Sequence, residues 1–81
     1  MSRIDELVAL AREYGRATGL DVSAVSWRVF GDTKKLSALM AGADIGIKRE
    51  EKALRWLSAN WPNGAKWPHS IERPLAAEAA R

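Results

Sequence analysis

The sequence has no cysteine and only one histidine, His69. The absence of cysteine excludes both a disulfide framework and a thiolate zinc site. The single histidine stands between Pro68 and Ser70, and the sequence has no cysteine or second histidine that could complete a metal site with it. We therefore expect a surface residue at this position, and neither a metal site nor a cofactor in the protein.

Long apolar runs are also missing. No stretch approaches the roughly 20 consecutive apolar residues that a transmembrane helix needs. The chain starts with an acidic segment, residues 2–6, which differs from the positively charged start of a signal peptide. We therefore expect a cytoplasmic protein without a targeting segment and without membrane contact.

Groups that could form a catalytic centre are equally scarce. Glu50 and Glu51 are neighbours in a predicted helix, so their side chains point in different directions and we expect them only to balance lysines. The segment 42–46 contains two glycines but lacks the Gly-Lys-Ser/Thr ending of a phosphate-binding loop. We therefore expect a protein that is not an enzyme.

The composition is that of one small folded domain. The 81 residues can build a single core, and an apolar fraction of 47% is well above that of disordered chains. Apolar residues recur at helical spacing along most of the chain, which predicts an all-α, compact four-helix domain over residues 1–68. The expected helices cover about 3–17, 22–30, 33–41 and 47–61.

Capping residues and glycines set the limits of these helices. Ser2 and Asp5 have the spacing of a capping box, Asp21 can cap the second helix, and Asp32 or Thr33 the third. We expect the segment 42–47 to be a loop, with a brief strand as the competing interpretation. In the third helix the apolar side chains expected to face inward are Leu36, Leu39 and Met40, and in the fourth they are Leu54, Leu57 and Trp61.

A Trp-Pro pair occurs twice, at residues 61–62 and 67–68, on either side of an Asn-Gly turn signal. One interpretation is that this loop folds back and that Trp67 covers the core next to Trp56. The other is that it forms an interaction surface. Residues 69–81 follow as a tail, which we expect to be frayed.

The net charge of +3 comes from the middle of the chain. Residues 32–67 hold seven basic and four acidic residues, whereas the charges on either side of this segment cancel. In the fourth helix, Lys48, Lys52 and Arg55 form a basic stripe bordered by Trp56. Such a zone suits a polyanionic partner, although a solvated helix face is an equally good interpretation.

Residues 11–31 resemble the helix-turn-helix segment of bacterial and phage repressors, including the lambda-repressor-like, LacI-like and TetR-like families. Gly15 matches the small residue where the two helices cross, and Gly19 matches the glycine of the turn. Leu20 and Val25 match the apolar residues that hold the second helix on the first, and Ser26 matches a serine that often follows. The late core position of the pattern falls on Arg28, one residue before Val29.

The resemblance implies that helix 22–30 is a recognition helix in the major groove of double-stranded DNA. The base-contacting candidates are Ser23, Ala24, Ser26 and Trp27, with a core position as the alternative for Trp27. The candidates for phosphate contacts are Arg28, Lys34, Lys35, Lys48, Lys52 and Arg55.

A rival assignment makes helix 33–41 the recognition helix, with Gly31 as the turn. It brings Lys34 and Lys35 to the DNA, but it places Trp27 at the crossing position and Ser37 at the inner apolar position. Packing therefore favours helix 22–30, whereas the placement of charge favours helix 33–41.

The predicted function is that of a sequence-specific transcriptional regulator, phage- or plasmid-like and without an effector domain. A homodimer is expected because one short helix contacts few base pairs. The alternative is a protein-protein interaction module that uses a Trp-rich surface at Trp56, Trp61 and Trp67. An RNA-binding role is less well supported, because no aromatic strand motif is present.

Overall fold

The computed structural model describes residues 3–68, 71 and 73. These described residues form four helices, α1 (Arg3–Thr18), α2 (Val22–Phe30), α3 (Lys35–Met40) and α4 (Ile47–Ala59). No strand occurs within these described residues, and the segment before α4 is a loop. The predicted all-α, four-helix architecture is confirmed.

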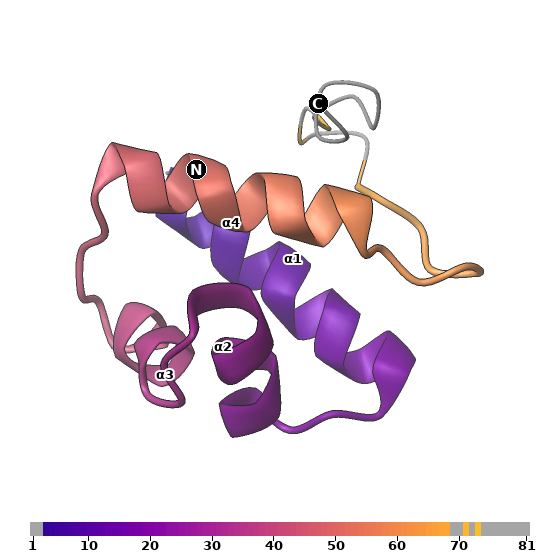
Figure 1. Cartoon of the computed structure of the whole chain (residues 1–81), viewed down its shortest axis with the longest axis horizontal. Helices are drawn as coiled ribbons and strands as arrows, with labels where there is room; N and C mark the ends of the chain where they lie inside the picture. Colours follow the sequence, from indigo (N-terminus) through magenta and orange to yellow (C-terminus); the bar gives the residue numbers. More distant parts are fainter. Residues whose placement is uncertain (1–2, 69–70, 72, 74–81) are drawn as a thin grey trace.

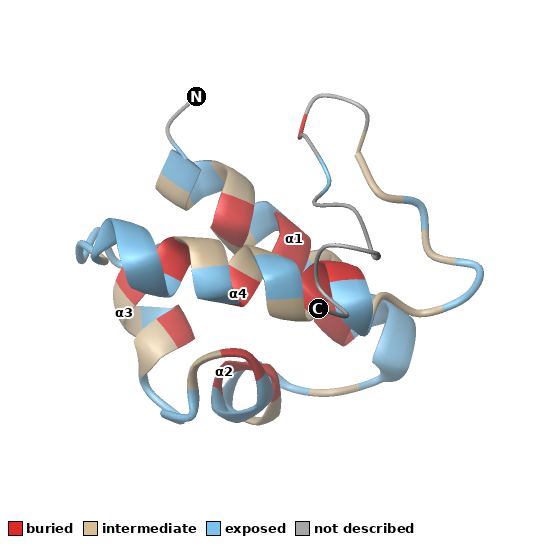
Figure 2. Ribbon diagram, turned by 45° about the horizontal axis from the view of Figure 1, so that its top comes forward, coloured by how far each residue is buried: buried red, intermediate tan, exposed pale blue. Residues whose placement is uncertain are grey.

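Helices α1 and α4 pack against each other, and α2 and α3 lie below them in Figure 1. The buried residues of the helices lie where the helices face one another (Figure 2). Each leucine buried in this way contributes about 1.5–3 kcal/mol through removal of its side chain from water. The buried apolar core is formed by Leu7, Leu10, Ala11, Tyr14, Val25, Val29, Leu36, Leu39, Ala53, Leu57 and Ile71.

The connection between α1 and α2 is short and depends on two glycines. Gly19 has a φ of 74°, the left-handed conformation that glycine adopts without strain. A Cβ atom on Gly15 would lie 3.0 Å from Val25 Cγ2 and 3.1 Å from the Leu20 carbonyl oxygen. Gly15 thus lets α1 and α2 approach closely, in the role that the sequence pattern gives it.

Helix α3 begins later than predicted, at Lys35 rather than at about Thr33. The Asp32 side chain does not cap a helix that starts at Thr33; instead its Oδ1 accepts a hydrogen bond from the Lys34 amide at 2.8 Å. The prediction that Met40 faces inward is wrong, because this side chain is 45% exposed at the end of a six-residue helix.

Helix α4 ends at Ala59, two residues before the predicted end at Trp61. Both the backbone amide and the side-chain amide of Asn60 donate to the Trp56 carbonyl oxygen, at 3.0 and 2.9 Å. These bonds satisfy a carbonyl group that the end of the helix would otherwise leave unpaired.

The interpretation of Glu50 as a surface residue that balances lysines is wrong. Glu50 is only 5% exposed, and its Oε1 lies 2.7 Å from Nε of Arg3 at the start of α1. Removal of a carboxylate from water is costly unless a positive charge accompanies it. The Arg3–Glu50 ion pair therefore joins the N-terminal ends of α1 and α4.

The Trp-Pro loop folds back, and Trp67 packs against the core, as one of the two interpretations predicts. The ring that Trp67 meets edge to face is that of Trp61 rather than Trp56, with centroids 4.9 Å apart. Trp56 instead forms an edge-to-face pair with Tyr14 of α1, at 5.4 Å. The loop is closed internally, because the indole N–H of Trp61 donates to the Ala65 carbonyl oxygen at 2.9 Å.

The domain extends past the predicted boundary at residue 68. Ile71 is 7% exposed, and its carbonyl oxygen accepts a hydrogen bond from the Trp67 indole. Arg73 lies 5.1 Å from the centre of the Trp67 ring and donates to the Ser58 carbonyl oxygen at 2.8 Å. Three predictions concern positions outside the described residues. They are the cap at Ser2, the surface position of His69 and the frayed tail as far as it covers residues 74–81.

Candidate nucleic-acid interface

Helix α2 has sharply defined ends. The side chain of Asp21 accepts a hydrogen bond from the Ala24 amide at 2.8 Å, as predicted for an N-cap. Gly31, with a φ of 71°, ends the helix, and its amide donates to the Trp27 carbonyl oxygen. Val25 and Val29 are buried against the core, so the opposite face of this nine-residue helix is turned to solvent.

Four residues lie on or beside that outer face of α2. Ser23, Trp27 and Arg28 are exposed, and Ala24 is half-buried. Trp27 is 60% exposed, so the alternative that it is a core residue is wrong. No other ring packs against Trp27 within the described part of the chain. The outer face thus presents three of the four predicted base-contacting residues together.

Ser26, the fourth base-contacting candidate, is fully buried and cannot meet a base. Its Oγ accepts a hydrogen bond from the Leu36 amide at 2.9 Å and donates to the Asp32 carbonyl oxygen. The side chain of Lys34, at the N-cap position of α3, makes no capping bond. Ser26 therefore serves as a cap for α3 that is supplied by the neighbouring helix.

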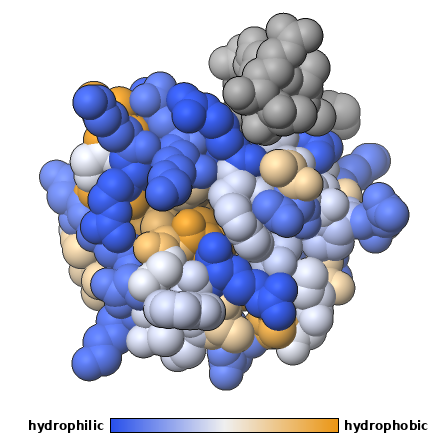
Figure 3. Space-filling view, viewed as in Figure 1, coloured by the Kyte–Doolittle hydropathy of each residue, from blue (hydrophilic) through white to orange (hydrophobic). Residues whose placement is uncertain are grey.

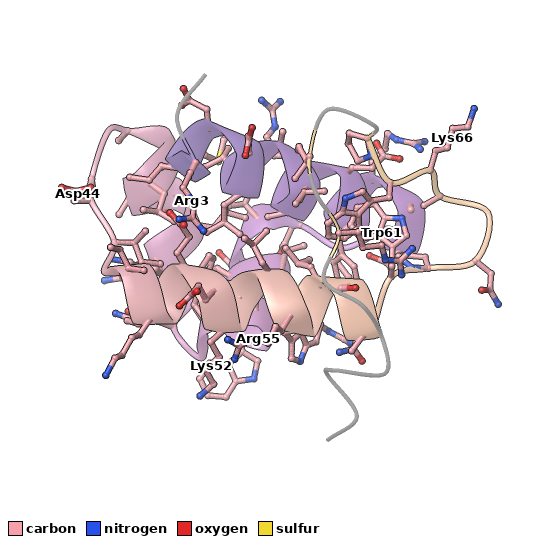
Figure 4. All side chains as sticks on the ribbon, turned by 90° about the horizontal axis from the view of Figure 1, so that it is seen from above. Arg3, Asp44, Lys52, Arg55, Trp61 and Lys66 are labelled. Carbon is pink, nitrogen blue, oxygen red and sulfur yellow. The ribbon has the colours of Figure 1, made fainter. Side chains whose placement is uncertain are left out.

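The predicted basic stripe of α4 is exposed. Lys48, Lys52 and Arg55 are all accessible to solvent, and Lys52 and Arg55 project from the side of α4 that is turned away from α1 (Figure 4). On the face seen in Figure 3, strongly hydrophilic side chains gather over α4, and side chains of intermediate hydropathy lie over α2.

An open groove lies between the C-terminal half of α2 and the neighbouring side of α4. Arg28, Arg49 and Lys52 contribute three positive charges to it, and none of them forms an ion pair with a carboxylate among residues 3–68, 71 and 73. Positive charge gathered in a concave site attracts an anion. The groove is lined by Trp27, Arg28, Val29, Phe30, Gly31, Arg49, Lys52 and Trp56.

Sequence reasoning missed Arg49. Arg49, Lys52 and Trp56 are spaced i, i+3 and i+7, so they lie on one side of a helix, which was the available signal. The predicted stripe of Lys48, Lys52 and Arg55 is centred on a neighbouring side of α4, roughly a fifth of a turn from the side that lines the groove.

The predicted basic residues of α3 are placed apart from this groove. Lys34 is exposed, whereas Lys35 is half-buried and its Nζ donates to the Asp44 carbonyl oxygen at 3.1 Å. Neither side chain lines the groove between α2 and α4. The structure thus brings Arg28 together with α4 and leaves the two lysines on a separate surface.

No group of three or more His, Cys, Asp or Glu side chains lies close enough to hold a metal ion within the described part of the chain. None of its helices combines the length and the apolar character needed to cross a membrane. Comparison with protein-family models, with curated proteins and with solved structures finds no match for this chain.

Proposed function

We propose that this protein is a sequence-specific DNA-binding transcriptional regulator that places α2 in the major groove. One observation carries the proposal: the solvent-facing side of α2 borders the same groove as two cations of α4, Arg49 and Lys52, which form no ion pair among the described residues. A helix in the major groove needs an exposed outer face for base edges and positive charge beside it for the phosphates.

The contacts between α1 and α2 support this assignment. The close approach at Gly15, the left-handed turn at Gly19 and the buried position of Val25 meet the packing needs of the repressor-like pattern. A recognition helix must be held firmly, because base contacts depend on its position relative to the phosphate contacts. The caps at Asp21 and Gly31 fix both ends of α2.

Arg28, Arg49 and Lys52 line the groove, and Lys48 and Arg55 are further exposed cations of α4. If all five neutralise phosphates, the logarithm of the affinity falls with the logarithm of the salt concentration at a slope of about −4.5. A change from about 50 to 200 mM salt then lowers the affinity roughly 500-fold.

A fluorescence-anisotropy titration tests the proposal, with a labelled pool of duplexes that carry about 20 randomised base pairs. Lys52→Glu should weaken binding strongly, because it places a negative charge in the groove. Lys66→Glu is the matched control, since Lys66 is also exposed but lies in the loop after α4, away from Lys52 (Figure 4). The proposal fails if no duplex binds at low salt, or if the two charge reversals weaken binding equally.

Helix α3 is the competing recognition helix, and Lys34 and Lys35 are its candidate contacts. It spans only six residues, and the Lys35 ammonium group is engaged with a backbone carbonyl. Lys34→Glu should therefore weaken binding less than Lys52→Glu. A larger effect of Lys34→Glu would transfer the role of recognition helix to α3.

Dimer formation belongs to the same proposal, because α2 alone covers few base pairs. Sedimentation of the complex with a selected duplex should give two protein copies per site.

The alternative function, a protein-docking surface formed by Trp56, Trp61 and Trp67, has less to support it. These three side chains are half-buried and pair with one another or with Tyr14.

A further inference from the structure

The outer face of α2 has little capacity for hydrogen bonding. Helix α2 contains no Asn, Gln, Asp, Glu or Lys, and Ser26 is turned into the core. Asp21, just before the helix, uses Oδ1 to accept the Ala24 amide. The polar groups that remain on or beside the face are the Ser23 hydroxyl, the Trp27 indole N–H, the Arg28 guanidinium and the second carboxylate oxygen of Asp21.

The same face offers a large apolar surface. Trp27 has 60% of its area in contact with solvent, and this surface adjoins Ala24 at i−3 and Ser23 at i−4 on the same side of the helix. An aromatic side chain usually buries a large area in the core. Exposure of this area at the centre of the outer face leaves it available to a ligand.

Base edges in the major groove differ in what they can offer such a surface. Adenine is read by Asn or Gln, cytosine by carboxylates, and guanine by Arg or Lys. Only the C5 methyl group of thymine gives an apolar contact. Arg28 is the single side chain of α2 suited to guanine, and it lines the groove beside Arg49 and Lys52, where a phosphate would compete for it.

We infer that the protein recognises its DNA site chiefly through thymine C5 methyl groups, packed against Trp27 and Ala24. The inference rests on the proposed function. It adds that T·A pairs stand where the outer face of α2 meets the bases, and that methyl contact rather than hydrogen bonding distinguishes them from other pairs.

Replacement of thymine by uracil tests this directly, because it removes only the methyl group and leaves charge and base pairing unchanged. Duplexes selected from the randomised pool are synthesised once with thymidine and once with deoxyuridine. Burial of one methyl group corresponds to about a fourfold difference in affinity. We expect the deoxyuridine duplex to bind about fourfold more weakly for each methyl group in contact.

Protein variants locate the contact. Trp27→Ala and Trp27→Gln should both bring the thymidine-to-deoxyuridine affinity ratio close to one while leaving the salt dependence unchanged. Ile47→Ala is the matched control, because Ile47 is 67% exposed at the start of α4 and lies away from the groove. It should keep the wild-type ratio.

The possible outcomes are distinct. Equal binding of the two duplexes by the wild type overturns the inference and leaves DNA binding itself intact. Persistence of the full wild-type ratio in both Trp27 variants also overturns it, since Trp27 would then make no contact with the methyl groups. Failure of every duplex to bind overturns the proposed function, and the inference with it.

Discussion

Substitution of Ser26 by alanine separates a structural role from a DNA-contacting role at this position. Ser26 is fully buried, and its hydroxyl is bonded both to the Leu36 amide and to the Asp32 carbonyl oxygen. Alanine fills nearly the same space but leaves the Leu36 amide without a partner. We therefore expect loss of stability rather than selective loss of DNA affinity.

The magnitude follows from the buried amide. An unsatisfied buried donor costs about 1–3 kcal/mol, and the better helix propensity of alanine returns about 0.5 kcal/mol. The net loss is about 0.5–2.5 kcal/mol. For a domain of this size each kcal/mol lowers the midpoint of thermal unfolding by about 4–8 °C, so we expect a decrease of about 2–20 °C.

Thermal unfolding, followed by the circular dichroism signal of the helices, measures the effect. Ser23→Ala is the control, because it makes the same chemical change on the exposed face of the same helix. It should alter stability by no more than about 0.5 kcal/mol. Equal midpoints for the two variants would refute the capping role of Ser26, and a selective loss of DNA affinity in Ser26→Ala would restore it as a base contact.

Three further predictions concern other parts of the molecule. Gly19→Ala should lower stability by about 1–2 kcal/mol, because alanine is strained at a φ of 74°; an unchanged urea midpoint would contradict this. Trp27→Phe should remove most of the tryptophan emission that acrylamide quenches, because Trp27 is the most exposed of the four tryptophans; equal quenching in both proteins would contradict it. The hydrogen bond from Arg16 holds the pKa of Glu13 below its ordinary value of 4.5, so the pair stabilises the fold at neutral pH and loses this effect as pH falls through the lowered pKa. NMR titration of the Glu13 carboxyl carbon should find this lowered pKa, and Arg16→Ala should raise it; no change in the variant would argue against the pair.

The features that sequence predicted well are those that depend on neighbouring residues. Asp21 and Gly31 limit α2 because capping and the left-handed turn are local properties of the backbone. Gly15 at the helix crossing was also predictable, because its four-residue spacing from Gly19 follows the repressor-like pattern. These residues define the position of α2, and they made its outer face predictable.

The features that sequence missed depend on residues far apart in the chain. The buried hydroxyl of Ser26 is bonded to the amide of Leu36, ten positions away. The buried carboxylate of Glu50 is paired with Arg3 on another helix. Helical periodicity gives the spacing of side chains on one helix but not which neighbour covers them. Periodicity likewise gives no ring partner for Trp67, which is Trp61 in the structure.

The cap that Ser26 provides also has a mechanical consequence. Because a side chain of α2 holds the first turn of α3, a rotation of α2 about its axis would break the bond to the Leu36 amide unless α3 moved with it. The two helices should therefore tilt as one body on the α1–α4 pair. The distance between the outer face of α2 and Lys34 is then fixed by the folded domain itself.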